Sequence, residues 1–190
     1  MKHPPGLLLM GILPLVFCWS ALAEESRPEG NVFHLKRMVE SSQPWKYQIH
    51  QNNIDLDPER SYRVTFVAKA SEPLQLSVST KICEPPWSGF GLREKVDLTT
   101  EWQTFEYVFE AQGTVPGRSR LTFYSADSAP GEFWIDSVVV RPADAEADST
   151  ENRILNPGFD EELTDWRVEG ARDGECVFEV QSLENAVPTP

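Results

Sequence analysis

The chain has 190 residues, of which 30 are acidic and 17 are lysine or arginine, and its net charge at pH 7 is −13. Nucleic acids and anionic membrane surfaces repel so acidic a protein, so both are excluded as partners and a neutral or cationic ligand is expected. The length is enough for one sandwich-sized domain or slightly more.

Residues 1–23 have the pattern of an export signal. Lys2 is followed by a largely apolar run from Gly6 to Trp19 that is too short for a comfortable membrane span, and Ala21-Leu22-Ala23 matches the small-x-small pattern before a cleavage site. We expect a signal peptide cleaved after Ala23 and a secreted, periplasmic or cell-surface protein that no longer contacts a membrane. Cleavage removes Lys2 and no acid, so the charge becomes −14.

Cleavage also removes Cys18 and leaves Cys83 and Cys176, which are 93 positions apart. In an oxidising compartment, two thiols predict one disulfide that ties the two ends of the chain together. The alternative is a pair of separate, buried free thiols, which are common in protein cores.

Short segments of alternating apolar and polar residues follow, separated by turn residues. Strands are expected at Val32–Leu35, Trp45–His50, Tyr62–Lys69, Leu74–Val78, Val96–Leu98, Trp102–Phe109, Leu121–Tyr124 and Phe133–Val140. No segment has a sustained apolar period of 3.6 residues. Seven or eight short strands of this kind predict an all-β sandwich.

The composition changes after the last of these strands. Residues 143–152 are rich in Ala, Asp, Glu and Ser, which predicts an acidic, solvated linker. Next, Asn156-Pro157-Gly158-Phe159-Asp160 reads as a turn that opens onto a partly buried segment, with Trp166 close behind. A last strand is expected at Glu175–Val180, and residues 182–190 are expected to be frayed.

Three blocks in the middle of the chain carry a family resemblance. They are Tyr62–Ala70, Val96–Gln103 and Phe133–Val138. In this order and spacing they resemble the jelly-roll carbohydrate-binding modules of families four, nine and twenty-two, in the galactose-binding-like superfamily. The resemblance covers residues 30–142, and it implies an antiparallel jelly-roll β-sandwich that binds carbohydrate.

In that family a module opens with an Asn-x-Gly-Phe-Glu type of start, then a Trp, then a short strand. This start is missing before Trp45, and residues 153–181 resemble it instead. Either the module is circularly permuted and residues 153–181 are its displaced opening strands, or they begin a truncated second module. We favour permutation, because a sandwich without its opening strands would expose unpaired backbone groups at its sheet edges.

The expected binding chemistry is stacking of sugar rings on aromatic side chains, with polar groups that read the hydroxyls. The residues expected to bind carbohydrate are Trp87, Phe90, Trp45, Tyr47, Gln48 and Tyr124. Trp87 is flanked by Pro and Gly in a stiff loop, and the alternative role for it is to cover one end of the core. Trp102 and Trp134 lie in the fold-defining blocks, so they are expected to pack in the core, as is Trp166.

The resemblance also implies a structural calcium ion and no other cofactor. Its carboxylate ligands match Asp160, near the displaced start, and Asp136, in the last strand of the central blocks. Calcium needs several oxygen ligands, and these are the two that the pattern identifies. The alternative for Asp160 is a solvated acid in a turn.

No pattern predicts catalysis. Beyond the leader the histidines are His34 and His50, and there is no nucleophile elbow, zinc-type cluster or phosphate loop. Acid pairs such as Glu161-Glu162 arise by chance among 30 acids. We therefore expect a secreted, non-catalytic module that binds a polysaccharide or oligosaccharide, with an associated glycoside hydrolase as a further partner. The alternatives are a structural or cell-surface interaction sandwich without sugar binding, and a fragment of a larger glycoside hydrolase.

Overall fold

A computed structural model describes residues 28–146, 148–170 and 174–183. The predicted leader (1–23) and most of the predicted frayed tail lie outside the described residues. The described elements are β1 (Asn31–Arg37), η1 (Pro44–Lys46), β2 (Gln48–Ile54), β3 (Ser61–Ala70), β4 (Leu74–Ile82), β5 (Gly89–Leu98), β6 (Gln103–Glu110), β7 (Ser119–Ser125), β8 (Gly131–Pro142), β9 (Arg167–Glu169) and β10 (Cys176–Ser182).

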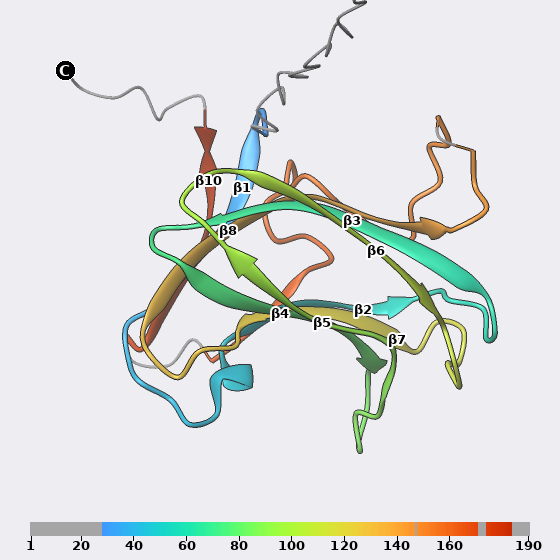
Figure 1. Cartoon of the computed structure of the whole chain (residues 1–190), viewed down its shortest axis with the longest axis horizontal. Helices are drawn as coiled ribbons and strands as arrows, with labels where there is room; N and C mark the ends of the chain where they lie inside the picture. The colour runs from blue at the N-terminus through green and yellow to red at the C-terminus, as the bar shows by residue number, and fades with distance from the viewer. Residues whose placement is uncertain (1–27, 147, 171–173, 184–190) are drawn as a thin grey trace, which may run out of the picture.

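The strands form two antiparallel sheets that face each other. One sheet has the order β10-β1-β8-β3-β6, and the other has the order β5-β4-β7-β2-β9. Figure 1 shows the two sheets as stacked layers, with the loop after β1 and the β4–β5 connection projecting from the outer side of the second sheet. The prediction of an all-β antiparallel sandwich is confirmed.

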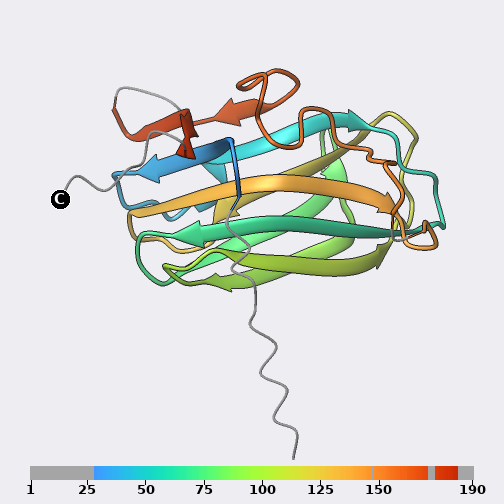
Figure 2. The same ribbon diagram turned by 90° about the horizontal axis from the view of Figure 1, so that it is seen from above.

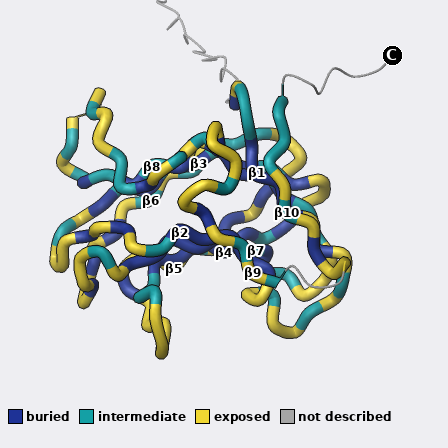
Figure 3. Tube along the Cα trace, turned by 180° about the vertical axis from the view of Figure 1, so that it is seen from behind, coloured by how far each residue is buried: buried dark blue, intermediate teal, exposed yellow. Residues whose placement is uncertain are grey.

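The core lies between the two sheets and follows from the alternation along each strand. In β3, Tyr62, Val64, Phe66 and Ala68 are buried, and the residues between them are partly exposed. Successive side chains of a strand point to opposite faces, so one face of each sheet can be apolar. In Figure 3 the buried parts of the trace run through the middle of the sandwich, and the loops are mostly exposed.

The C-terminal segment adds one edge strand to each sheet. β10 pairs with β1 in antiparallel register from Asn31↔Ser182 to Arg37↔Cys176, and β9 pairs with β2. Figure 2 shows the red C-terminal strands beside the blue β1 and the cyan β2. Phe159 and Trp166, which precede these strands, belong to the same buried core as the central strands. Residues 153–183 are therefore part of the sandwich that residues 30–142 form.

The predicted linker is anchored at both of its ends. The Ala143 N–H donates to the carbonyl of Ser61, and the Asn152 side chain accepts from the N–H of Val140 and donates to the carbonyl of Val138. Asn152 thus satisfies backbone groups of β8 that would otherwise lack partners. Several residues between these anchors are exposed, in keeping with their acidic composition.

Three local predictions differ from the structure. Trp45 lies in η1 and not in a strand, because Pro44 has no N–H to donate to a sheet and fits the first turn of a helix. β5 begins at Gly89, well before the strand that was predicted at Val96–Leu98, and it includes the Gly-Phe-Gly segment. The three-residue strand β9 was not predicted, since it is too short to show a period.

The predicted disulfide is not formed, because Cys83 and Cys176 are both free. Cys83 follows β4 in one sheet, where its thiol lies 3.6 Å from the Asn53 side chain, and Cys176 opens β10 in the other sheet. The thiol of Cys176 is buried, and this burial raises its pKa to about 12. Across residues 28–146, 148–170 and 174–183, there is no helix that is long and apolar enough to cross a membrane.

Candidate functional site

A groove lies on the outer face of the sheet β5-β4-β7-β2-β9, between two exposed tryptophan rings. It has a volume of about 580 Å³. Its lining residues are Trp45, Lys46, Gln48, Lys81, Trp87, Arg120, Tyr124 and Glu169. Trp45 is 47% exposed and Trp87 is 52% exposed, although rings of this size usually bury most of their surface. We call this hollow the Trp45–Trp87 groove.

Trp87 is held by the connection between β4 and β5. Its φ is +53°, a left-handed conformation that bulky residues rarely adopt, and its N–H donates to the Glu84 carbonyl at 2.7 Å. The Ile82 N–H donates to the carbonyl of Ser88 and closes the loop, and the Glu84 carboxylate pairs with Arg118. These contacts fix the loop that carries the ring.

Trp45 is positioned by η1, which packs against the end of β9. Gly170, with a φ of +95°, lies so close that a Cβ atom there would be 2.3 Å from the Lys46 carbonyl oxygen. Only glycine allows this approach, because any side chain would collide with the backbone next to Trp45. β9 therefore determines where one of the two rings stands.

The floor of the groove is a hydrogen-bonded network from three neighbouring strands. Arg120 of β7 donates to Gln48 of β2 at 2.8 Å and to Thr122 at 3.1 Å. Gln48 in turn donates to the Glu169 carboxylate of β9 at 2.6 Å. The Arg120 guanidinium lies 3.8 Å from the same carboxylate. This network holds the polar groups of the floor in fixed orientations.

His50 lies beside this network in a buried position, with its Nε2 atom 3.7 Å from the Glu169 carboxylate. Burial is the main cause that lowers its pKa, to about 4, and the positive charges of Arg120, Arg167 and Lys81 lower it further. The imidazole is therefore neutral at physiological pH. Its Nδ1 atom is buried without a hydrogen-bond partner among the described residues.

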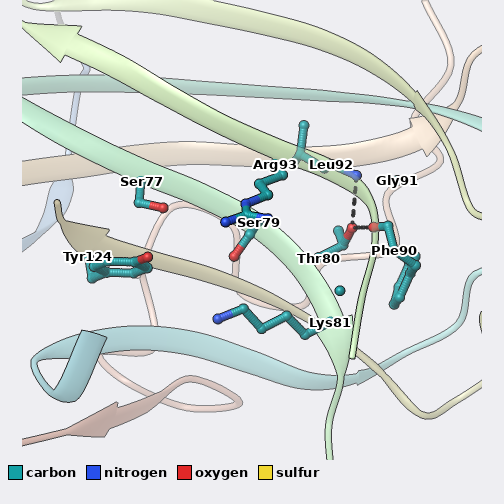
Figure 4. A pocket seen from close by; sticks show the side chains of 10 residues that line it. Ser77, Ser79, Thr80, Lys81, Phe90, Gly91, Leu92, Arg93 and Tyr124 are labelled. Carbon is teal, nitrogen blue, oxygen red and sulfur yellow. Dashed lines mark hydrogen bonds between the residues drawn. The ribbon is translucent and has the colours of Figure 1, made fainter. Parts of the chain in front are cut away.

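A second hollow of about 380 Å³ continues the groove over β4 and β5. Lys81 and Tyr124 line both hollows, so they form one extended surface. Ser77, Ser79 and Arg93 line only the second. Figure 4 shows the side chains of Lys81 and Arg93 extending along the face of the sheet toward Tyr124.

The structure brings four of the six predicted carbohydrate-binding residues into the Trp45–Trp87 groove. These are Trp45, Gln48, Trp87 and Tyr124. Gln48 and Tyr124 are directly paired across β2 and β7, which explains why they meet there.

Tyr47 and Phe90 do not offer free rings. Each is 7% exposed and belongs to the hydrophobic core, and the Tyr47 hydroxyl donates to Glu175 at 2.7 Å. Trp45 and Tyr47 do not belong to one strand, because η1 contains Trp45 and Tyr47 directly follows it. The two rings therefore need not lie on the same face, and the ring of Tyr47 points into the core. Phe90 is an inward-facing residue of β5, which begins one residue before it.

Four groove residues were missed in the sequence, namely Lys46, Lys81, Arg120 and Glu169. Lys46 follows Trp45 directly in η1. Lys81 and Arg120 lie on strands whose outward positions alternate with apolar residues, so the period of two would have placed both on the outer face. Their proximity needs the register Lys81↔Arg120. For Glu169 there was no signal, because β9 has only three residues.

Of the other three tryptophans within the described residues, only Trp166 packs in the core as predicted. Its ring lies 5.2 Å from that of Phe159 and its indole N–H donates to the Asn156 carbonyl. Trp102 and Trp134 are outside the core cluster. Both rings lie about 5 Å from the Lys69 ammonium, at 5.2 and 5.0 Å. They lie on the opposite sheet from the groove.

The carboxylates of Asp136 and Asp160 both lie close to Gly158. A Cβ atom at Gly158 would be 3.7 Å from one Asp136 oxygen and 3.6 Å from one Asp160 oxygen. Asp136 is 2% exposed, and its Oδ1 has no hydrogen-bond partner among the described residues. Burial raises the pKa of Asp136, and the nearby Asp160 charge adds to this. Two carboxylates, one of them buried and under-satisfied, supply the type of oxygen ligand that a hard cation prefers. Within the described residues, no cluster of three or more metal-binding side chains exists.

The fold and the groove together define a class of protein. It is a β-sandwich that presents an aromatic-flanked polar groove on one sheet face. The carbohydrate binding domain family CBM_4_9 matches residues 20–130, which is more than half of the chain. The chain therefore belongs to this family of carbohydrate binding domains.

Solved structures support the same fold. A structure named PbXyn10C CBM aligns with a TM-score of 0.62 at 19% identity and covers 84% of this chain and 92% of its own. One entitled "CBM4 structure and function" has a TM-score of 0.53 at 23% identity, with coverage of 58% and 70%. The second N-terminal cellulose-binding domain of Cellulomonas fimi β-1,4-glucanase C has a TM-score of 0.52 at 19% identity, with coverage of 60% and 77%. No curated protein sequence matches the chain.

Proposed function

We propose that this protein is a secreted, non-catalytic module that holds a polysaccharide or oligosaccharide in the Trp45–Trp87 groove. The observation that carries the proposal is the pair of exposed indole rings that flank one polar floor. Sugar rings stack on the two indoles, while Gln48, Tyr124 and Glu169 hydrogen-bond to their hydroxyls. An open groove of this kind gives modest affinity, on the order of −4 to −8 kcal/mol, or millimolar to micromolar binding.

The groove contains too few carboxyl groups for glycoside hydrolysis, which favours binding over catalysis. Glycoside hydrolases need two carboxyl groups on opposite sides of the scissile bond. Among the described residues that line the two hollows, Glu169 is the only acid. We propose that any hydrolysis belongs to an associated enzyme, as the glucanase origin of one similar cellulose-binding domain illustrates. The export pattern of residues 1–23 supports secretion of the module.

We further propose that Asp136 and Asp160 hold a structural calcium ion. The ion would neutralise the buried, under-satisfied Asp136 carboxylate and join β8 to the turn before β9. Both carboxylates lie in the structural part of the fold, so the ion would stabilise the module and would take no direct part in sugar binding.

Gel retardation tests the proposed function. Native gels that contain xylan, β-glucan, mannan or a soluble cellulose derivative should slow the protein in at least one case, relative to a gel without polysaccharide. An unchanged mobility in every gel, confirmed by calorimetry with the matching oligosaccharides, would contradict carbohydrate binding.

A further inference from the structure

The groove is positively charged although the chain as a whole is strongly acidic. Lys46, Lys81, Arg93 and Arg120 line the two hollows, against the single acid Glu169. The net charge of the chain is −13. A cleft lined by one sign of charge focuses its field and attracts ligands of the opposite sign, whatever the overall charge. The cationic side chains therefore lie on the same sheet face as the exposed rings of Trp45 and Trp87.

Strand register brings these cations together. Lys81 of β4 pairs directly with Arg120 of β7, and Ser79 of β4 pairs with Arg93 of β5. The Lys81 ammonium also lies 5.9 Å from the centroid of the Tyr124 ring. The charges thus form a row across three neighbouring strands, beside the aromatic residues of the groove.

The protein itself does not neutralise most of this charge. Within the described residues, no carboxylate lies within ion-pair distance of Lys81 or Arg93, and Arg120 has only Glu169 at 3.8 Å. Burial lowers the pKa of Lys81, and the charges of Arg120 and Arg93 lower it further. Partly buried cations that repel one another destabilise a fold unless an anion is supplied.

A polar atom without a partner lies in the same row. Ser79 is 6% exposed, and its hydroxyl is buried without a hydrogen bond to any described residue. It stands opposite Arg93 on the face that lines the second hollow. A hydroxyl donor next to an unpaired guanidinium is suited to an oxygen-rich anion.

We propose that the groove binds a polysaccharide that carries uronic-acid carboxylates at intervals, with the sugar rings against Trp45 and Trp87 and a carboxylate against Lys81, Arg93 and Arg120. This rests on the proposed function, and it replaces the neutral or cationic ligand that the overall charge led us to expect. The charges that line the groove influence a bound ligand more than the net charge of the protein does, because screening confines electrostatic interactions to about 8 Å at physiological ionic strength.

The overall charge still limits which anionic polymer fits. A chain that carries a sulfate on nearly every sugar brings a dense negative charge to a protein whose net charge is −13, and the two repel each other. A polymer with occasional carboxylates places one charge at the cationic row and neutral sugars elsewhere. We therefore expect selection for carboxylated polymers over densely sulfated ones.

The test compares each acidic polymer with its own carboxyl-reduced form, so that only the charge differs. Glucuronoxylan, polygalacturonate and alginate are used as such pairs, with dextran sulfate as the sulfated polymer, and affinity is measured by gel retardation and calorimetry. We expect at least one acidic polymer to bind roughly tenfold more tightly than its reduced form, the effect of one charge-assisted hydrogen bond.

The Lys81→Gln and Arg93→Gln variants should each lose roughly this tenfold preference for the acidic polymer over its reduced form. Arg63→Gln is the matched control, because Arg63 lies on the other sheet and pairs with Glu106 at 2.7 Å. This variant should keep the preference.

The outcomes separate the two proposals. Equal binding of acidic and reduced forms, or tightest binding of dextran sulfate, would overturn the uronate preference and leave carbohydrate binding intact. Failure to bind any polymer would overturn both.

Discussion

Trp45 and Trp87 are the two aromatic side chains that the described part of the chain leaves largely exposed. The position of each ring is fixed by the conformation of its backbone and not by packing of the ring in the core. Trp45 follows Pro44 in a single helical turn, and Trp87 sits in a left-handed conformation closed by hydrogen bonds. Rigid rings lose little entropy on binding, so they are well suited to stacking on sugars.

We expect Trp87→Ala and Trp45→Ala each to weaken polysaccharide binding roughly thirtyfold, or about 2 kcal/mol, as is typical of an aromatic anchor. The melting temperature should change little because both rings are exposed. Trp102→Ala, on the opposite sheet, is the matched control and should bind like wild type. Calorimetry measures all three, and unchanged affinity in both groove variants would exclude this groove as the binding site.

Asp136 leads to a prediction about pH and calcium. Its pKa in the fold is raised above the ordinary value of 3.8, so without metal the folded state holds the proton more tightly than the unfolded state. The stability from this group is full below pH 3.8 and is lost as the pH rises through the higher folded value. At pH 7, calcium at 100 times its Kd should restore about 2.7 kcal/mol, or roughly 5 to 10 °C in Tm.

Thermal melts with calcium and with EDTA at pH 5 and pH 7 measure this effect. Asp136→Asn removes the titrating charge, so its stability should depend less on pH and should not respond to calcium. A wild-type Tm that is the same in calcium and in EDTA at pH 7 would contradict the proposed site.

At the scale of elements, the short strand β9 connects the fold to the groove. It places Glu169 on the floor and Gly170 against η1. The alternation along the long strands predicted most of the sandwich. It could not predict β9 or the helical turn at Trp45, since three residues do not establish a period.

Alanine substitutions at two glycines distinguish the positioning of Trp45 by β9 from the effect of backbone strain alone. Gly170→Ala should strain a φ of +95° and push the Lys46 carbonyl, displacing Trp45 and weakening sugar binding roughly tenfold. Gly174→Ala also has a positive φ, +79°, but its Cβ would meet nothing within 4 Å. The positive φ should cost each variant about 1–2 kcal/mol of stability. The collision with the Lys46 backbone should cost Gly170→Ala more, and only this variant should lose affinity. Equal affinities would show that β9 does not position the ring.

At the scale of the whole molecule, the two ends of the described sandwich meet. The Leu183 N–H donates to the carbonyl of Gly30 at 2.9 Å, and β10 pairs along β1. We interpret residues 153–181 as the displaced opening strands of a circularly permuted module, because they complete an edge of each sheet. Termini that lie together allow such a rearrangement without a change in packing.

A rearranged chain tests this interpretation. It begins at Ser149, joins Leu183 to Gly30 through a short Gly-Ser linker and ends at Asp148. We expect it to fold with the same strand content and to bind the same polysaccharide, because the new break falls in an exposed connection.

Residues 30–148 alone are the control and should not fold, because β1 and β2 lose their edge partners and the core loses Phe159 and Trp166. A stable fold of this fragment, or failure of the rearranged chain, would contradict the permuted arrangement.

The sequence by itself determined the class of fold, because a period of two and turn residues are local properties that each strand displays on its own. The family followed from the resemblance of three ordered sequence blocks and not from this period. The sequence also singled out Trp45, Gln48, Trp87 and Tyr124, which the structure brings into one groove, since their chemistry and surroundings are visible in the chain. Only the tertiary structure separated these four from the buried rings of Tyr47 and Phe90. Only strand register placed Lys81, Arg93 and Arg120 side by side, as charges distant in sequence become neighbours when strands pair. The positive groove of this acidic protein is therefore a property of the folded sheet.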